Sequence, residues 1–225
     1  MRDLIPPSSS YDDTRTRVAQ YFDATATRVW ERLTSDAPVS RIRQTVREGR
    51  DAMRALMLAQ LPGDLRGARV LDAGCGTGAA SAELAARGAD VTAIDISPKL
   101  VEIARARLPQ TLAGRVDFRA GDMLAANLGR FDHVIAMDSL IYYTRPDLEA
   151  ALDALSARAG SVVFTVAPRT PLLMAMWHAG RMLPRADRSP SMIPHDWRRM
   201  NVAGLDRVGR VSRGFYISEC LRVAS

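Results

Sequence analysis

The stretch Val70-Leu71-Asp72-Ala73-Gly74-Cys75-Gly76-Thr77-Gly78 decides the fold of this chain. It joins a short apolar run to a helical stretch. Glycines are needed at such a junction because the chain turns sharply and a bound ligand lies against bare backbone. The spacing is typical of nucleotide-binding α/β domains. With Ala79 it also satisfies the Gly-x-Gly-x-x-Ala fingerprint of dinucleotide sites, so the loop alone leaves the ligand open.

Downstream of the loop, short apolar runs alternate with helical stretches, as in the βαβ units of a parallel sheet. Five strands are predicted, at residues 69–73, 90–94, 116–119, 131–137 and 161–167. Helices are predicted from about Thr77, from Pro98 after the N-cap residue Ser97, and from Pro146. Residues 202–223 indicate a closing antiparallel hairpin. The predicted fold class is α/β, a Rossmann-like doubly wound sheet with helices on both faces.

The segments on either side of this pattern are expected to add a helical cap and a lid. Residues 1–13 are rich in Pro, Ser and Asp and predict a frayed tail. Two helices follow, and the second has apolar residues at three-to-four spacing with arginines on its other faces. We therefore divide the chain into a tail and helical cap at 1–63 and a main domain at 64–225, with an insertion at 168–200 acting as a lid.

Composition narrows the classes of function. The chain has 225 residues, 47% of them hydrophobic, a formal net charge of +6 and two cysteines. It has no run of about 18 apolar residues and no apolar signal region at its start, so we expect a cytoplasmic protein, with contact at the membrane surface left open. The arginines are scattered rather than grouped, which argues against a nucleic-acid partner.

The acidic residue beside the glycine loop favours a cationic ligand. Asp72 ends the first predicted strand, where a dinucleotide would present its pyrophosphate and be repelled. S-adenosylmethionine has no phosphate and carries a positive sulfonium and a positive amino group, so a carboxylate there attracts it. We therefore expect S-adenosylmethionine as cofactor, with S-adenosylhomocysteine as its product. An NAD-dependent oxidoreductase is the alternative from another class.

Two further aspartates follow the next strands and complete the expected donor site. Asp95 comes about 20 residues after the loop, a place from which a carboxylate accepts both ribose hydroxyls. Asp122 is expected to meet the adenine amino group while Met123 packs on the ring. The predicted cofactor-binding residues are Asp72, Gly74, Cys75, Gly76, Gly78, Asp95, Ile96, Asp122, Met123, Met137 and Asp138.

The acceptor is expected to be a small molecule. Enzymes that methylate the amino group of a DNA base need an Asn/Asp-Pro-Pro-aromatic segment after the fourth strand, and residues 137–143 read Met-Asp-Ser-Leu-Ile-Tyr-Tyr instead. The insertion is rich in Met and Trp, which either form an adaptable surface for a large flat ligand or cover the sheet as ordinary core. Its apolar and basic residues include Leu172, Leu173, Met174, Met176, Trp177, Met182, Met192, Trp197, Arg169, Arg181, Arg185 and Arg188.

Four segments together resemble the magnesium protoporphyrin IX O-methyltransferase family, and look closest to its purple-bacterial branch. They are Tyr21-Phe22 with residues 30–33, the glycine loop, residues 138–143, and Phe215-Tyr216. The resemblance implies a class I methyltransferase fold with seven strands, the last two forming a hairpin. It also implies methylation of one propionate carboxylate of Mg-protoporphyrin IX in bacteriochlorophyll biosynthesis. No metal is then expected besides the magnesium of the substrate, and the porphyrin-binding subunit of magnesium chelatase is a candidate partner.

The resemblance further implies roles for two tyrosines. Tyr21 matches an N-terminal tyrosine at the edge of the family's site, expected to close over the donor and orient the carboxylate. Tyr142 stands where plant and cyanobacterial members carry histidine, so we expect it to position the acceptor rather than act as an obligatory acid or base. A methyltransferase for another small molecule, such as a quinone precursor, and a porphyrin-binding protein without activity stay as alternatives.

Overall fold

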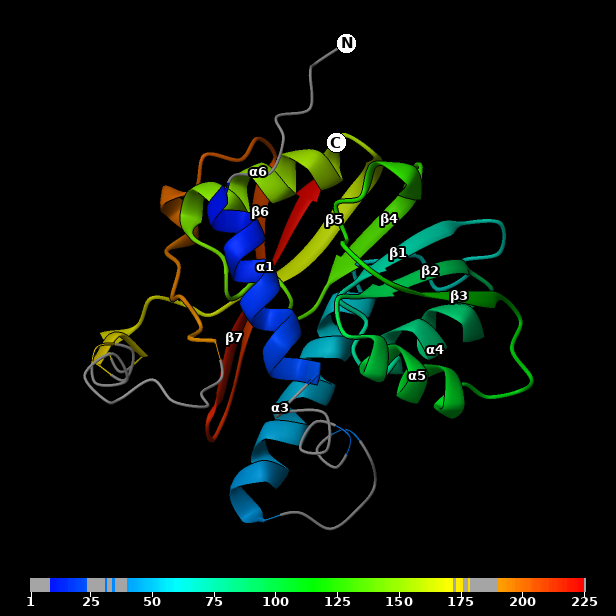
Figure 1. The fold of residues 1–225 in the computed structure, drawn as a ribbon, viewed down its shortest axis with the longest axis horizontal. Helices are drawn as coiled ribbons and strands as arrows, with labels where there is room; N and C mark the ends of the chain where they lie inside the picture. The colour runs from blue at the N-terminus through cyan, green and yellow to red at the C-terminus, as the bar shows by residue number, and fades with distance from the viewer. Residues whose placement is uncertain are drawn as a thin grey trace.

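A computed structural model of the protein describes residues 9–23, 31, 34, 40–171, 173–175, 178 and 190–224. Its centre is a seven-stranded sheet in the order β3-β2-β1-β4-β5-β7-β6 (Figure 1). Strands β1 to β5 are parallel, and β7 runs antiparallel between β5 and β6. This confirms the predicted α/β fold and its closing hairpin. The strands are β1 (Arg69–Ala73), β2 (Asp90–Asp95), β3 (Arg115–Ala120), β4 (Phe131–Ala136), β5 (Ala159–Val166), β6 (Leu205–Arg213) and β7 (Tyr216–Ala224).

The register of the parallel strands brings their carboxyl ends to one edge of the sheet. Ala73 at the end of β1 pairs with Ile94 of β2, and Asp95 at the end of β2 pairs with Ala120 of β3. Ala136 ends β4, the other neighbour of β1. The segments that follow these strands, including the glycine loop after Ala73, therefore meet at the same edge, where open α/β sheets bind their ligands.

Helices cover both faces of the sheet. On one face, α4 (Ala79–Ala86) and α5 (Pro98–Arg107) pack against β2 and β3, and α3 (Arg41–Leu58) packs against β6 and β7. On the other face, α6 (Arg145–Ser156) packs against β5, and α1 (Ser9–Tyr21) buries Tyr11 in the same core cluster. Two short 3-10 helices are Ala126–Leu128 and Trp197–Arg199. Among the described residues, no helix is long and apolar enough to cross a bilayer.

The expectation of a frayed tail over residues 1–13 is wrong from Ser9 onward, where α1 begins. Tyr11 is only 2% exposed, and its ring stacks on Tyr143 with ring centroids 4.8 Å apart. The Ser10 hydroxyl donates a hydrogen bond to Asp147, with 2.8 Å between the oxygens. These contacts to α6 and the loop before it order a segment whose composition alone favours disorder.

The predicted lid is described only in part. At its two ends, Pro168 forms a bridge with His195, and the Ile193 N–H donates to the Ile141 carbonyl at 2.8 Å. The insertion thus leaves β5 and returns beside the loop after β4, and its function as a lid stays a prediction. Among the residues that the sequence analysis singled out, those outside the described part of the chain are Trp30, Arg32, Leu33, Leu172, Met176, Trp177, Arg181, Met182, Arg185 and Arg188.

Helix α3 shares a core cluster with the sheet. Its buried Met53, Met57 and Leu58 pack in the cluster that also holds Val70 of β1. The domain boundary that we expect at residue 63 stays a prediction, but the hydrophobic core itself continues across it. The helix also comes very close to β7, because Gly49 lies directly against the Tyr216 ring.

Gly49→Ala should therefore destabilise the protein. A Cβ at Gly49 would lie 2.6 Å from Cδ1 and 2.8 Å from Cβ of Tyr216, so the ring or the helix must move. Such overpacking costs about 1–3 kcal/mol, which exceeds the helix-propensity gain of about 1 kcal/mol. Thermal unfolding should show a melting temperature several degrees lower. Gly63→Ala is the matched control, because a Cβ there meets nothing within 4 Å. An unchanged melting temperature for Gly49→Ala would contradict the packing.

Candidate functional site

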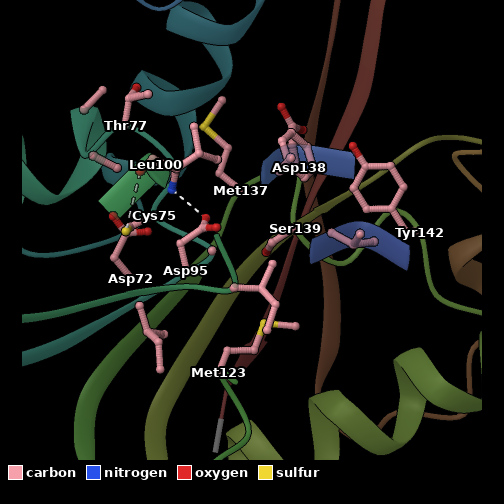
Figure 2. Close-up of a pocket in the computed structure, with 18 of the residues that line it drawn as sticks. Asp72, Cys75, Thr77, Asp95, Leu100, Met123, Met137, Asp138, Ser139 and Tyr142 are labelled. Carbon is pink, nitrogen blue, oxygen red and sulfur yellow. Dashed lines mark hydrogen bonds between the residues drawn. The ribbon is translucent and has the colours of Figure 1, made fainter. Parts of the chain in front are cut away.

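A cavity of about 350 Å³ opens at the carboxyl edge of the sheet, between α1 and α3. Ten of the eleven predicted cofactor-binding residues line it. The exception is Gly78, which precedes α4 and packs against Ala104 of α5. Figure 2 shows Asp72, Cys75 and Asp95 at one side of this cavity and Asp138 with Tyr142 at the other. Of the two predicted tyrosines, Tyr142 lines the cavity, whereas Tyr21 lies beside the lining residue Phe22, with ring centroids 5.2 Å apart.

The glycine loop is fixed by backbone hydrogen bonds to β2. The N–H groups of Gly74 and Cys75 both donate to the Ile94 carbonyl, at 2.8 and 3.0 Å. Gly74 has φ 88°, and a Cβ there would overlap Ser139. A Cβ at Gly76 would meet nothing within 4 Å, so space for a ligand borders the loop at that residue. The positive φ and the packing against Ser139 thus require glycine at position 74, and contact of this residue with the ligand stays a prediction.

Asp95 holds the same loop through its carboxylate. One oxygen accepts a hydrogen bond from the Gly76 N–H at 2.8 Å, the bond drawn in Figure 2, and the other accepts from the Ser97 N–H at 2.9 Å. Burial raises the pKa of Asp95, and the two backbone donors oppose that shift. Each carboxylate oxygen has a further lone pair. The group is thus oriented by the backbone and placed to accept hydrogen bonds from hydroxyl groups in the cavity.

Asp72 is fully buried at the end of β1. The Ser81 hydroxyl of α4 donates to its carboxylate at 2.5 Å. Burial raises the pKa of Asp72 to about 7, the negative charge of Asp95 adds to this, and the Ser81 hydrogen bond opposes it. The thiol of Cys75 lies in the same region, and burial raises its pKa as well, so it stays protonated at neutral pH. A cation bound here would favour the ionised form of Asp72.

Helix α1 closes the cavity at Asp122, a contribution that the sequence analysis missed. The Tyr11 hydroxyl donates to Oδ1 of Asp122 at 2.7 Å, and Arg15 Nη1 donates to Oδ2 at 2.7 Å. The Leu124 N–H also donates to Oδ1, at 2.9 Å. Asp122 therefore lines the cavity while both of its carboxylate oxygens accept hydrogen bonds from α1. A signal for this helix was present in the buried stripe Tyr11, Thr14, Val18 and Phe22, which repeats at three-to-four spacing.

Asp138 is held at the other side of the cavity by three structural elements. It is the one described non-glycine residue with positive φ, at 55°, and its N–H donates to the Thr165 hydroxyl at 2.7 Å. Its carboxylate accepts hydrogen bonds from Arg50 of α3, from Thr165 of β5 and from the Tyr216 hydroxyl of β7. Such strain persists only where the surroundings fix the residue, as they do here. Arg50 is a second site residue that the sequence analysis missed.

Tyr142 lies next to this cluster and is 8% exposed. Its ring makes an edge contact with Phe22, with centroids 6.4 Å apart. Burial raises the pKa of Tyr142 above its ordinary value, and the negative charge of Asp138 adds to the shift. The phenol is thus protonated at neutral pH, which suits it to hydrogen bonding and not to acting as a base.

The site therefore has two regions of different chemistry. Asp72, Asp95 and Asp122 form a row of acidic groups along the strand ends, a row that suits a ligand with hydroxyl groups, positive charge and no phosphate. Arg50 and Tyr142 form a hydrogen-bonding region beside it. A cationic nucleoside and an anionic second ligand are the pair that this arrangement suits.

Comparison with known families places the chain among methyltransferases. Residues 70–158 match the methyltransferase domain family, and residues 136–225 match the family described as the magnesium-protoporphyrin IX methyltransferase C-terminus. A magnesium-protoporphyrin O-methyltransferase of Rhodobacter capsulatus is 57% identical over 95% of this chain and 97% of its own length.

A solved structure and a second group of enzymes give further comparisons. The magnesium protoporphyrin IX methyltransferase of Synechocystis with bound S-adenosylhomocysteine superposes with a TM-score of 0.77 at 31% identity, over 94% of this chain and all of that one. A ubiquinone biosynthesis O-methyltransferase of Xanthomonas oryzae is 39% identical, but over only 54% of each chain. A ubiquinone biosynthesis O-methyltransferase of Bordetella avium is 31% identical over 75% of this chain and 70% of its own length.

The raised pKa of Asp72 predicts a specific pH dependence of stability. The folded chain keeps the proton up to about pH 7, whereas the unfolded chain releases it near pH 4. The free energy of unfolding should therefore fall as the pH rises from about 4 to 7, by up to about 1.4 kcal/mol per pH unit, and level off above pH 7.

Asp72→Asn removes this titration and can still accept the Ser81 hydrogen bond. Urea unfolding of both proteins between about pH 5 and pH 7 measures the difference in their free energies of unfolding. We expect the wild type to lose stability relative to the variant as the pH rises. A difference that stays constant over this range would show that Asp72 is already ionised at the lower pH.

Proposed function

Because the chain belongs to the magnesium-protoporphyrin O-methyltransferase family, we propose that it transfers a methyl group from S-adenosylmethionine to a propionate carboxylate of Mg-protoporphyrin IX. The product is the monomethyl ester, in the bacteriochlorophyll pathway. The observation that carries this proposal is the 57% identity to the Rhodobacter enzyme over 95% of the chain. The row of acidic groups in the cavity supports it, because this methyl donor is a cation without phosphate.

The residues present fit this donor. We propose that Asp95 accepts the ribose hydroxyls, that Asp72 lies toward the positively charged amino-acid end, and that Met123 packs on the adenine near Asp122. The open space at Gly76 is the place where the backbone can approach the donor. When bound, S-adenosylmethionine supplies a methyl group made electrophilic by its sulfonium.

The chain's own residues have a limited chemical task. A propionate has a pKa near 4–5 and is already ionised at neutral pH, so no base has to remove a proton. What remains is to align the carboxylate and keep water out, which lowers the barrier through orientation. We propose that Tyr142 positions the acceptor through its protonated phenol and that Tyr21, beside Phe22, closes the edge of the site. On this proposal, Tyr142 does not have to act as a base.

The alternatives are weaker on specific grounds. The ubiquinone-pathway enzymes are 39% identical over 54% of the chain or 31% identical over 75% of it, whereas the Rhodobacter enzyme is 57% identical over 95%. An NAD-dependent oxidoreductase would place a pyrophosphate near the buried Asp72, and the family match to a methyltransferase argues against this alternative.

We also propose that a partner delivers the sparingly soluble porphyrin inside the cytoplasm. The porphyrin-binding subunit of magnesium chelatase is the partner favoured by the chemistry of magnesium insertion.

The direct test is a methyl-transfer assay on the purified protein. With S-adenosylmethionine and Mg-protoporphyrin IX, we expect the monomethyl ester, detected by chromatography and by a mass increase equal to one CH2 unit. A demethylated quinone precursor supplied in parallel should stay unmethylated. Methylation of the quinone precursor without any porphyrin ester would contradict the proposed function.

Asp95→Ala should weaken donor binding. The loss of charge-assisted hydrogen bonds to the ribose corresponds to about 1–3 kcal/mol, or about a 5- to 150-fold higher dissociation constant for S-adenosylhomocysteine. Isothermal titration calorimetry measures it, with thermal unfolding as a check because Asp95 also holds Gly76. Asp117→Ala, an exposed aspartate of β3, is the matched control. If Asp95→Ala does not fold, Asp95→Asn serves instead. Unchanged affinity in a folded variant would rule out the ribose assignment.

A further inference from the structure

An anionic acceptor meets an electrostatic difficulty in this cavity. Asp72 and Asp95 are fully buried in its wall, and Asp138 is 10% exposed beside Tyr142. A carboxylate that leaves water is stable only if it is paired and hydrogen-bonded, and further carboxylates raise that demand. The acceptor region therefore needs a cation, and guanidinium is the group that best matches a carboxylate because its planar fork donates two parallel hydrogen bonds.

Four arginines line the cavity among the described residues, Arg15, Arg47, Arg50 and Arg54. Arg15 lies at the far end, on Asp122, and Arg47 lies on α3 about one turn before Arg50. Arg54 is bonded to Asp51 at 2.9 Å and to Glu83 at 2.5 Å, both of them exposed. Arg50 is the one whose described ion pair is with Asp138, the residue that follows β4 next to Tyr142. Arg50 differs from the other arginines of the cavity in its position beside Asp138 and Tyr142, since all of them carry the same charge.

The position of Arg50 is fixed from several sides. Its Nη1 donates to Oδ2 of Asp138, whose carboxylate also accepts from the Tyr216 hydroxyl at 3.1 and 3.2 Å. Tyr216 in turn packs against α3 at Gly49, one residue before Arg50. The Arg50 side chain is 20% exposed, so it borders the cavity and is largely shielded from bulk water. A guanidinium held in this way loses little conformational entropy when a ligand binds.

We propose that Arg50 binds the carboxylate of the acceptor, and that Asp138 and Tyr216 are positioning residues that orient its guanidinium. The guanidinium lines the cavity, and its described bond to Asp138 is made by Nη1. Arg50 transfers no proton and stays a cation throughout. It donates charge-assisted hydrogen bonds to the incoming propionate beside Tyr142 and shares its positive charge between that group and Asp138. This inference rests on the proposed function, because it assigns the residue that recognises the acid group of that acceptor.

The test compares two porphyrins that differ only in their acid groups. Mg-protoporphyrin IX and its dimethyl ester are titrated, by porphyrin absorbance and fluorescence, into the wild type, Arg50→Ala and Arg50→Lys. Arg50→Ala should bind the diacid about ten- to hundredfold more weakly while its affinity for the dimethyl ester is unchanged. Arg50→Lys should restore part of the loss, because it keeps the charge but not the fork. Arg43→Ala, an exposed arginine of the same helix, is the matched control.

Two further measurements separate this role from a structural one. S-adenosylhomocysteine affinity, measured by calorimetry, should change less than about twofold in Arg50→Ala, and Tyr216→Phe should raise the KM for porphyrin about two- to tenfold with kcat nearly kept. Equal weakening for diacid and dimethyl ester, or weaker donor binding with unchanged porphyrin binding, would overturn the inference. If Arg50→Ala does not fold, Arg50→Lys and Tyr216→Phe give the same comparison. If the wild type binds neither porphyrin, the result contradicts the proposed function as well as the inference. If the wild type binds both porphyrins and the Arg50 variants bind the diacid equally well, the result contradicts the inference alone.

Discussion

The double hydrogen bond from backbone N–H groups to Asp95 is the interaction on which the site depends. One carboxylate oxygen holds Gly76 of the glycine loop, and the other holds Ser97 at the start of α5. The end of β2 thus fixes both the loop after β1 and the helix after itself. Because the strands are parallel, this places the loop, the acidic residues and the segment after β4 around one cavity. Without that connection, the loop would keep only the backbone hydrogen bonds from Gly74 and Cys75 to β2.

The concentration of acidic groups in so small a space has an energetic consequence. Asp72 is buried and has a pKa raised to about 7, so part of the protein population holds it neutral when no cation is present. Asp122 is compensated by Arg15, and Asp138 by Arg50. Among the described residues, the cavity therefore has ion pairs at its two ends, whereas Asp72 and Asp95 next to the glycine loop accept hydrogen bonds from neutral groups alone. A donor with positive charge at that place supplies the missing countercharge, which a pyrophosphate cannot do.

Local signals in the sequence predicted the parts of the fold that local chemistry determines. β1 has the predicted bounds, and Ser97 caps α5 with Pro98 at its first position, because capping depends on neighbouring residues alone. Ten of the eleven donor-site residues line one cavity since each follows or precedes a strand end. The contributions of α1 and α3 were missed for a physical reason. Tyr11 meets Asp122 across 111 positions and Arg50 meets Asp138 across 88, and no periodicity reveals which distant partner a polar side chain finds.

Calorimetric titration of the wild-type protein with S-adenosylmethionine and, separately, with NADH tests the central electrostatic claim most directly. If the carboxylates of the strand ends select a positively charged nucleoside without phosphate, the first titration gives saturable binding with one site per chain. The second gives no measurable heat of binding under the same conditions. Saturable binding of NADH, together with no binding of S-adenosylmethionine, would contradict the account.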